Sequence, residues 1–446
     1  MNKINLENIP EMIQSSIIMD EPNQTIPAYS GIYKLYREGK SMLIDGGMTF
    51  EWFPTKQIRF NGNVLKSEFP LDEVVKLENK YELIIDKLNV GNCHFSEINF
   101  GENSKVHGVL DHQGIIGDKS IPVSKIIFSI PNLREFLGDP VKISEYGISK
   151  ARLSLVTDKY TIHIDHKKEH KELKEKLKLK GGYLILHTGE IIKKEGAIHY
   201  DDLNYIKYCL SSFLSFLNGR KTGILFAQGI HEGEVKWTDF TPIQVDIFKP
   251  VHSWPCKLSV DGINESWNKY FEIWKAQNEE DFLNSAVHWY LEANVDSIIE
   301  NSIVLTQIGL ELIYNWFVIE NKKMLIGKDA ENISAANKIR LLLSQIGLQN
   351  YVPAHFTELN SYVNENNLPD GIDAFVQIRN SLVHSQEKRR KEFNKVDPKV
   401  IYQVYEIGLW YLELAILRVI EFNGKYSFRC SDAKWTVQNE INVPWK

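Results

Sequence analysis

An arginine, an asparagine and a histidine fall close together near the end of the chain, in the stretch QIRNSLVHSQEKRRKEF. Asn380 follows Arg379 directly, and His384 comes five residues after Arg379. A histidine titrates near neutral pH and can transfer protons, whereas an arginine stays charged and can hold a phosphate group. These residue types suit the cleavage of RNA by its own 2′-hydroxyl, which needs proton transfer and positive charge at the phosphate but no metal ion.

The residues around this pair fit the same chemistry. Asn380 lies four residues before His384 and could hold the imidazole or a phosphate oxygen by a hydrogen bond. A basic run beyond the histidine would attract the RNA backbone; it consists of Lys388, Arg389, Arg390 and Lys391. An arginine five residues before a histidine is also common by chance. The alternative is therefore a solvated helix face followed by a charged loop.

A helix must position these side chains, and its faces can be worked out at about 100° per residue. One broad apolar face would point into a helical core; it contains Gly371, Phe375, Ile378 and Leu382. A second, narrower apolar seam contains Ile372, Val376 and Val383. Arg379 and His384 flank this seam about 140° apart, so one copy makes an incomplete site. We expect two seams to meet about a two-fold axis, with the histidine of one chain near the arginine of the other.

Composition limits the class of protein. The 446 residues are 43% hydrophobic and 25% charged, which is typical of a soluble protein of two or three domains. A net charge of −6 argues against nonspecific coating of nucleic acid. Four scattered cysteines without a C-x-x-C pair indicate a reducing compartment. No apolar signal segment is evident at the amino terminus, and the stretch VYEIGLWYLELAILRVI contains charges, so we expect a cytoplasmic protein without a membrane span.

The pattern of apolar residues changes along the chain and predicts an α+β protein. Residues 1–262 contain short β-branched runs bounded by glycine, asparagine or proline, among them IQVDIF at 243–248, with helical patterns only around 167–180 and 201–219. Residues 263–446 have helical spacing almost throughout, and the last long helix begins at an Asp-Pro pair. We therefore expect a β-rich amino-terminal region followed by an all-α bundle.

The sequence RNSLVH resembles the R-N-x-x-x-H motif of the HEPN superfamily, whose members are small helical bundles. The resemblance covers about residues 281–424. A β-rich region followed by such a bundle is similar to the layout of ApeA-like anti-phage defence proteins. The resemblance implies a metal-independent endoribonuclease without a cofactor, whose site is shared across a homodimer. It places Arg379 and His384 in the catalytic positions and Asn380 in a supporting one.

The same resemblance implies a role in defence, in which RNA cleavage halts translation in an infected cell. The β-rich region would then sense a phage-derived trigger, restrain the nuclease or select the RNA. Some HEPN proteins cut no RNA and act as partners of other proteins. A non-catalytic module for binding or dimerisation is therefore the competing expectation.

The segment HIDHKKEH is the best metal-like cluster in the chain; it offers His163, Asp165, His166 and His170. The lysines and glutamates around it favour an exposed charged helix, so a metal-dependent enzyme is the third alternative.

REGKSM ends like a phosphate-binding loop but lacks the first glycine of that motif, because position 34 is Lys34. We expect a hairpin turn there. His288, Trp289 and Tyr290 share a helix and are expected to pack rather than to stack on bases.

Overall fold

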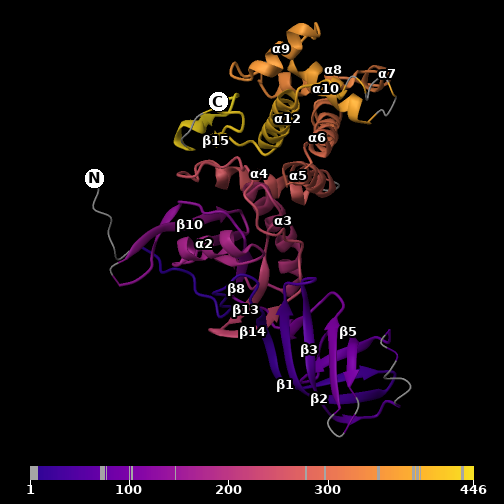
Figure 1. Cartoon of the computed structure of the whole chain (residues 1–446). Helices are drawn as coiled ribbons and strands as arrows, with labels where there is room; N and C mark the ends of the chain where they lie inside the picture. The colour runs from indigo at the N-terminus through magenta and orange to yellow at the C-terminus, as the bar shows by residue number, and fades with distance from the viewer. Residues whose placement is uncertain are drawn as a thin grey trace.

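The computed structural model has a β-rich amino-terminal half and a helical carboxy-terminal half (Figure 1). It describes residues 9–70, 76, 78–99, 101, 104–145, 147–276, 279–295, 298–348, 352–383, 387, 391, 393–432 and 436–446. The expected order of strands followed by helices is confirmed at this level. In Figure 1 a barrel, an eight-stranded sheet and the helical region follow one another.

The first six strands close into a barrel in the spatial order β1-β2-β3-β6-β5-β4. Side chains alternate between its interior and solvent, as in Tyr33 and Leu35, which are fully buried, and Ile32, which is half exposed. The ring of Tyr33 contacts Phe60 edge-on at 6.0 Å inside the barrel. The strands are β1 (Ile26–Arg37), β2 (Lys40–Glu51), β3 (Gln57–Ser67), β4 (Tyr81–Ile85), β5 (Leu88–Asn99) and β6 (Lys105–Leu110).

Eight further strands form an antiparallel sheet in the order β7-β14-β13-β8-β12-β11-β10-β9. Helix α2 (His170–Lys180) connects β11 to β12, and α3 (Tyr200–Asn218) connects β12 to β13. The strands are β7 (Ile115–Gly117), β8 (Lys125–Pro131), β9 (Asp139–Lys142), β10 (Ile148–Val156), β11 (Tyr160–His166), β12 (Ile185–Lys193), β13 (Leu225–His231) and β14 (Glu234–Asp239).

The barrel and the sheet are joined by aromatic packing. Trp52 of the barrel stacks on Tyr183 at 5.1 Å, and Phe50 meets Phe226 edge-on at 4.9 Å. These residues belong to one apolar core that also holds the buried side chains of α2. A second core joins the other face of the sheet and α3 to the helical region.

The helical region begins with α4 at Ile263. Its long central helix is α12, which buries most of its residues among the other helices. The elements are α4 (Ile263–Lys275), α5 (Glu279–Val295), α6 (Ile299–Tyr314), the π-helix η2 (Asn315–Asn321), α7 (Lys328–Glu331), α8 (Ala335–Gln345), α9 (Thr357–Glu365), α10 (Gly371–Val383) and α12 (Pro398–Val419).

Two expectations from the sequence are wrong in detail. The segment IQVDIF is not a strand, because its backbone makes single bonds to different partners, such as those of Asp246 to Lys221 and Phe248 to Gly182. The carboxy-terminal region is not all helical, since β15 (Lys425–Ser427) pairs with β16 (Glu440–Asn442) beyond the 3-10 helix η3 (Thr436–Asn439). This hairpin packs onto the link that leads from the sheet to α4, where Ser427 N donates to Trp254 O at 2.6 Å.

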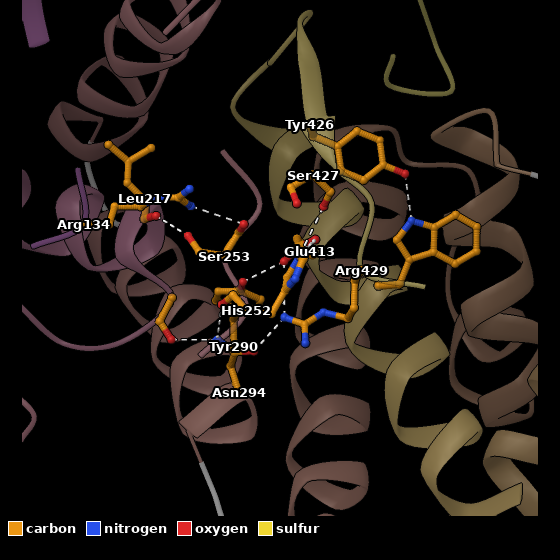
Figure 2. A network of polar contacts seen from close by, with 12 residues as sticks. Arg134, Leu217, His252, Ser253, Tyr290, Asn294, Glu413, Tyr426, Ser427 and Arg429 are labelled. Atoms are coloured by element: carbon orange, nitrogen blue, oxygen red, sulfur yellow. Dashed lines mark hydrogen bonds and ion pairs between the residues drawn. The ribbon is translucent and has the colours of Figure 1, made fainter. Parts of the chain in front are cut away.

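A buried ion pair stands at this junction (Figure 2). Glu413 of α12 is fully buried and accepts hydrogen bonds from Tyr290 at 2.7 Å and from Arg429 at 3.4 Å. Arg429 also donates to the side-chain oxygen of Asn294 at 2.6 Å. The side-chain nitrogen of Asn294 donates in turn to Gly219 O at 2.7 Å. Burial raises the pKa of Glu413, while Arg429 and Tyr290 oppose that rise.

The same network includes the segment that follows the sheet. Asn294 donates to His252 O at 3.0 Å, and His252 Nε2 donates to Ser427 O at 3.2 Å. Gly219 ends α3 with a φ of +71°, and an added Cβ would lie 2.4 Å from His252 O. The end of α3, the link, α5, α12 and the carboxy-terminal hairpin therefore meet at one set of polar contacts.

Replacing Arg429 should destabilise the protein strongly. We expect Arg429→Leu to lower the free energy of unfolding by about 3–5 kcal/mol, because Glu413 would stay buried without its cation. Lys125→Leu is the control, since Lys125 pairs with Glu190 at 3.5 Å and is 40% exposed. It should cost less than about 1 kcal/mol. Equal losses in denaturant titrations of the two variants would contradict this account.

Candidate functional site

Helix α10 carries the predicted catalytic residues, and its start is held firmly. Arg340 of α8 donates two hydrogen bonds to Asp370, at 2.8 and 2.9 Å. Asp370 Oδ1 in turn accepts from the backbone N–H of Ile372 and of Asp373, which satisfies donors at the helix start. Phe375 and other apolar side chains of α10 are buried in the helical core. The helix is thus fixed at its first turn and along one face.

Arg379 is half-buried near the end of this helix. Its guanidinium donates to Asn380 Oδ1 at 3.2 Å, and its Nε is buried and has no partner in the part of the chain that the structure describes. Its remaining N–H groups make no other hydrogen bond with described residues, so they could donate to a phosphate oxygen. The two neighbouring residues that the sequence singled out are therefore in direct contact.

Four of the predicted site residues lie outside the described residues: His384, Lys388, Arg389 and Arg390. Lys391 is described, and its ammonium pairs with Glu387 at 2.6 Å on an exposed surface. The expected approach of His384 to Arg379 therefore stays a prediction.

An open groove of about 1210 Å³ lies beside Asn380, between α9, α10 and the first turn of α12. Gln377, Asn380 and Val376 of α10 line one side of it. Glu365 of α9 and Phe393 line other parts. Helix α9 has no motif that links it to α10, so the sequence could not indicate that these helices enclose a common groove.

The apolar seam predicted on α10 is only partly exposed. Ile372 is fully buried and belongs to the helical core, because α6, α8, α9 and α12 all contact this helix. Val376 is half-buried at the groove, and Val383 is 44% exposed. The exposed part of the seam is therefore Val376 and Val383, without Ile372.

The HIDHKKEH cluster does not come together as a site. His163 and Asp165 point to one face of β11 and His166 to the other, because side chains alternate along a strand. Asp165 forms a buried, two-bond ion pair with Arg152, with both distances 2.8 Å. His163 lies 3.2 Å from Ser154 Oγ. These two residues have structural partners of their own.

A different histidine completes a buried group that the sequence did not indicate. His166 lies opposite His187 in the ladder between β11 and β12, and His170 comes from α2. The ring centroids are 5.2 Å apart for His166 and His170, and 5.4 Å for His170 and His187. His187 is 1% exposed, and neither of its ring nitrogens has a hydrogen-bond partner among the residues that the structure describes.

Burial disfavours the charged form of His170 and His187. It lowers the pKa of His170 to about 3 and that of His187 well below its usual value, and the nearby His166 and Lys174 act in the same direction. His166 Nδ1 donates to Lys167 O at 2.9 Å. Within the described ranges no set of three or more His, Cys, Asp or Glu side chains is arranged to hold a metal ion.

The remaining motifs have structural roles. REGKSM forms the hairpin between β1 and β2, where Glu38 and Gly39 have φ values of +48° and +81°. Tyr290 is packed in the core and bound to Glu413, as expected for a structural aromatic. The four cysteines are free and buried.

Two family models match parts of the chain. Residues 276–440 match the YopA C-terminal domain, and residues 118–251 match the YopA central domain. The chain is also similar along its whole length to the SPbeta prophage-derived uncharacterized protein YopA of Bacillus subtilis (strain 168). The two share 26% identity over 99% of each chain. No solved structure matches the chain. These descriptions name no activity.

In the part of the chain that the structure describes, two helical segments could cross a membrane by length and composition alone, Ile299–Asn321 and Pro398–Val419. Of their most apolar windows, 50% and 72% of the residues are buried within the protein. Core helices of soluble proteins pass the same test, so the expected cytoplasmic location stays a prediction.

The buried histidines should make the protein sensitive to acid. The unfolded chain takes up protons as the pH falls below 6.5, whereas folded His170 stays neutral down to about pH 3. The contribution of these histidines to the free energy of unfolding is therefore complete above pH 6.5. It is lost as the pH falls, by up to about 1.4 kcal/mol per pH unit for each such histidine.

We expect His187→Leu to lessen this dependence of the free energy of unfolding on pH, measured by denaturant titration between pH 7.5 and 4.5. His107→Leu is the control, because His107 is exposed on the barrel. An unchanged slope in His187→Leu would show that this histidine does not carry the effect.

Proposed function

We propose that this chain is a metal-independent endoribonuclease that cuts RNA through Arg379 and His384, with Asn380 in support. The observation that carries the proposal is the contact between Arg379 and Asn380 at the edge of an open groove. The arginine is half-buried and tethered by its neighbour, yet its other donors are uncommitted among the described residues. A cation held in this way suits a phosphate whose charge grows during cleavage.

The proposed reaction needs only groups of the protein and the RNA. The 2′-oxygen attacks the adjacent phosphorus while the bond to the 5′-oxygen breaks. A base takes the proton of the 2′-hydroxyl, and an acid gives a proton to the departing 5′-oxygen. His384 is proposed to move these protons, and Arg379 to stabilise the charged phosphorus centre. The products carry a 2′,3′-cyclic phosphate and a 5′-hydroxyl.

We further propose that such cleavage serves anti-phage defence by stopping translation in the infected cell. The resemblance of RNSLVH to the HEPN motif supports this role. The prophage origin of the similar Bacillus protein also fits a role in conflict between phages. We assign the sensing of an infection signal to the β-rich region, whose Gly219 and His252 backbone oxygens accept hydrogen bonds from Asn294 of the helical region.

A non-catalytic binding module is the second candidate, and the charge of the groove favours it. Four carboxylates line the groove: Glu358, Glu365, Asp373 and Asp397. Lys395 is the only cation among the described residues of its lining. A surface of this charge could hold a protein partner rather than RNA.

Cleavage should depend on both predicted catalytic residues. Arg379→Ala and His384→Ala should each lower the rate of RNA cleavage by at least about a hundredfold, because each removes charge or proton transfer from the transition state. His288→Ala is the control, since His288 is 46% exposed on α5. RNA ends are measured after cleavage with and without EDTA. Growth arrest is measured separately, in cells that express each variant.

A folded His384→Ala protein that cuts as well as the wild type would overturn the assignment. Loss of cutting in EDTA would overturn the metal-free mechanism, and growth arrest without any RNA cleavage would favour the binding module.

The proposed homodimer has a separate test. Val383→Asp should shift the mass measured by light scattering toward the monomer and lower cleavage, because a carboxylate would be placed in an apolar contact. Ile326→Asp changes an apolar residue that is 78% exposed elsewhere in the helical region, and it should leave the mass unchanged. A dimer that survives Val383→Asp would exclude this part of α10 as the interface.

A further inference from the structure

We infer that the groove beside Arg379 and Asn380 binds the bases of single-stranded RNA rather than its phosphates, and that Glu365 favours bases that carry an amino group. This inference rests on the proposed function, because it assigns substrate recognition to the same site.

Three of the four carboxylates are already engaged. Glu358 accepts hydrogen bonds from Gln403 at 2.8 Å and from Lys399 at 3.1 Å, and these bonds lower its pKa to about 2. Asp373 pairs with Arg340. Asp397 caps α12 and accepts from Lys399 N at 2.8 Å. Glu365 is exposed and has no partner within the described ranges, so its oxygens are left to accept from a ligand.

The other side of the groove offers amide groups. Gln377 is exposed on α10, and its side chain makes no hydrogen bond with described residues. Asn380 uses its oxygen to hold Arg379, which leaves its amide N–H₂ to donate. A carboxylate and two amides therefore face one groove with both acceptors and donors.

Apolar side chains form the remaining walls. Val376, Leu368, Phe393 and Val396 line the groove and are partly buried against the helical core. They offer contact to an apolar surface, while the carboxylate and amides offer contact to a polar edge. A nucleobase has this combination, because its faces are apolar and its edge carries donors and acceptors.

A phosphate chain does not fit the same lining. RNA backbones are held by several cations, and Lys395 alone is cationic among the described residues of the groove. The phosphate would instead lie at Arg379, next to Asn380, while unpaired bases enter the groove. Such bases are accessible in single strands and loops.

Glu365 sets the expected base preference. A carboxylate accepts a hydrogen bond from the amino group of cytosine, whereas uracil carries a carbonyl oxygen at that position. Bases with an amino group should therefore bind better than uracil. Cytosine and uracil are matched in size, so their comparison isolates this one group.

The experiment measures binding of 2′-O-methyl oligo(C) and oligo(U) to the full-length protein by fluorescence anisotropy. Neither probe can be cut, because the attacking hydroxyl is blocked. We expect oligo(C) to bind about tenfold more tightly than oligo(U), and Glu365→Ala to remove this preference. Glu320→Ala should keep it, because Glu320 is exposed on η2 outside the groove.

Equal binding of the two probes by the wild type would overturn the inference, as would a preference that survives Glu365→Ala. Binding of an oligolysine peptide that depends on Glu365, without binding of either probe, would overturn it in favour of a basic protein segment. Cleavage of natural RNA is measured separately. If RNA is cut without a base preference, the inference fails alone. If the preference is found but no RNA is cut, the proposed nuclease fails and the base-binding groove stands.

Discussion

The buried pair of Glu413 and Arg429 is the constraint on which the arrangement of the chain depends. Two charges can stay in an apolar interior only while each has its partner and further hydrogen bonds. Tyr290 and Asn294 of α5 supply part of these bonds, and the amide of Asn294 is held in turn by the backbone oxygen of Gly219 at the end of α3. The pair itself joins α12, α5 and the carboxy-terminal hairpin, and Asn294 extends the network to the end of α3 and to the link. The network therefore specifies the orientation of the helical region on the sheet. The stability of this junction comes mainly from the apolar core that the two regions share.

The candidate site depends on this arrangement indirectly. Helix α12 carries Glu413 in its second half, and its first turn forms one wall of the groove beside Asn380. A shift of the sheet or of the carboxy-terminal hairpin would disturb the hydrogen bonds of the network. Because Glu413 belongs to this network, the shift would then change the position of α12. If the β-rich region senses a signal, α12 offers a continuous rigid connection from the junction to the proposed catalytic residues.

The sequence predicted those features that one segment determines by itself. The change from strands to helices and the Glu38–Gly39 hairpin both follow from local spacing. The bond from Arg379 to Asn380 was not expected, because the sequence suggested His384 or a phosphate as the partner of Asn380. Features that need distant segments were missed. Ile372 was placed on an exposed seam because an isolated helix gives no sign of the neighbours that cover it. His187 gave no signal because only the register of β11 against β12 brings it opposite His166. The groove was missed for the same reason, since α9 and α10 meet only after folding.

The closed barrel decides how the amino-terminal region can be approached. A sheet with an open edge can accept a further strand from another protein, but a barrel in which β1 pairs with β4 offers no such edge. The outer strand β9 of the larger sheet is also occupied, because Lys142 exchanges backbone hydrogen bonds with Pro10 and Met12. A molecule that binds the barrel must therefore recognise side chains on the outer wall or at the ends of the barrel. The specificity of such binding would depend on these side chains and not on backbone pairing.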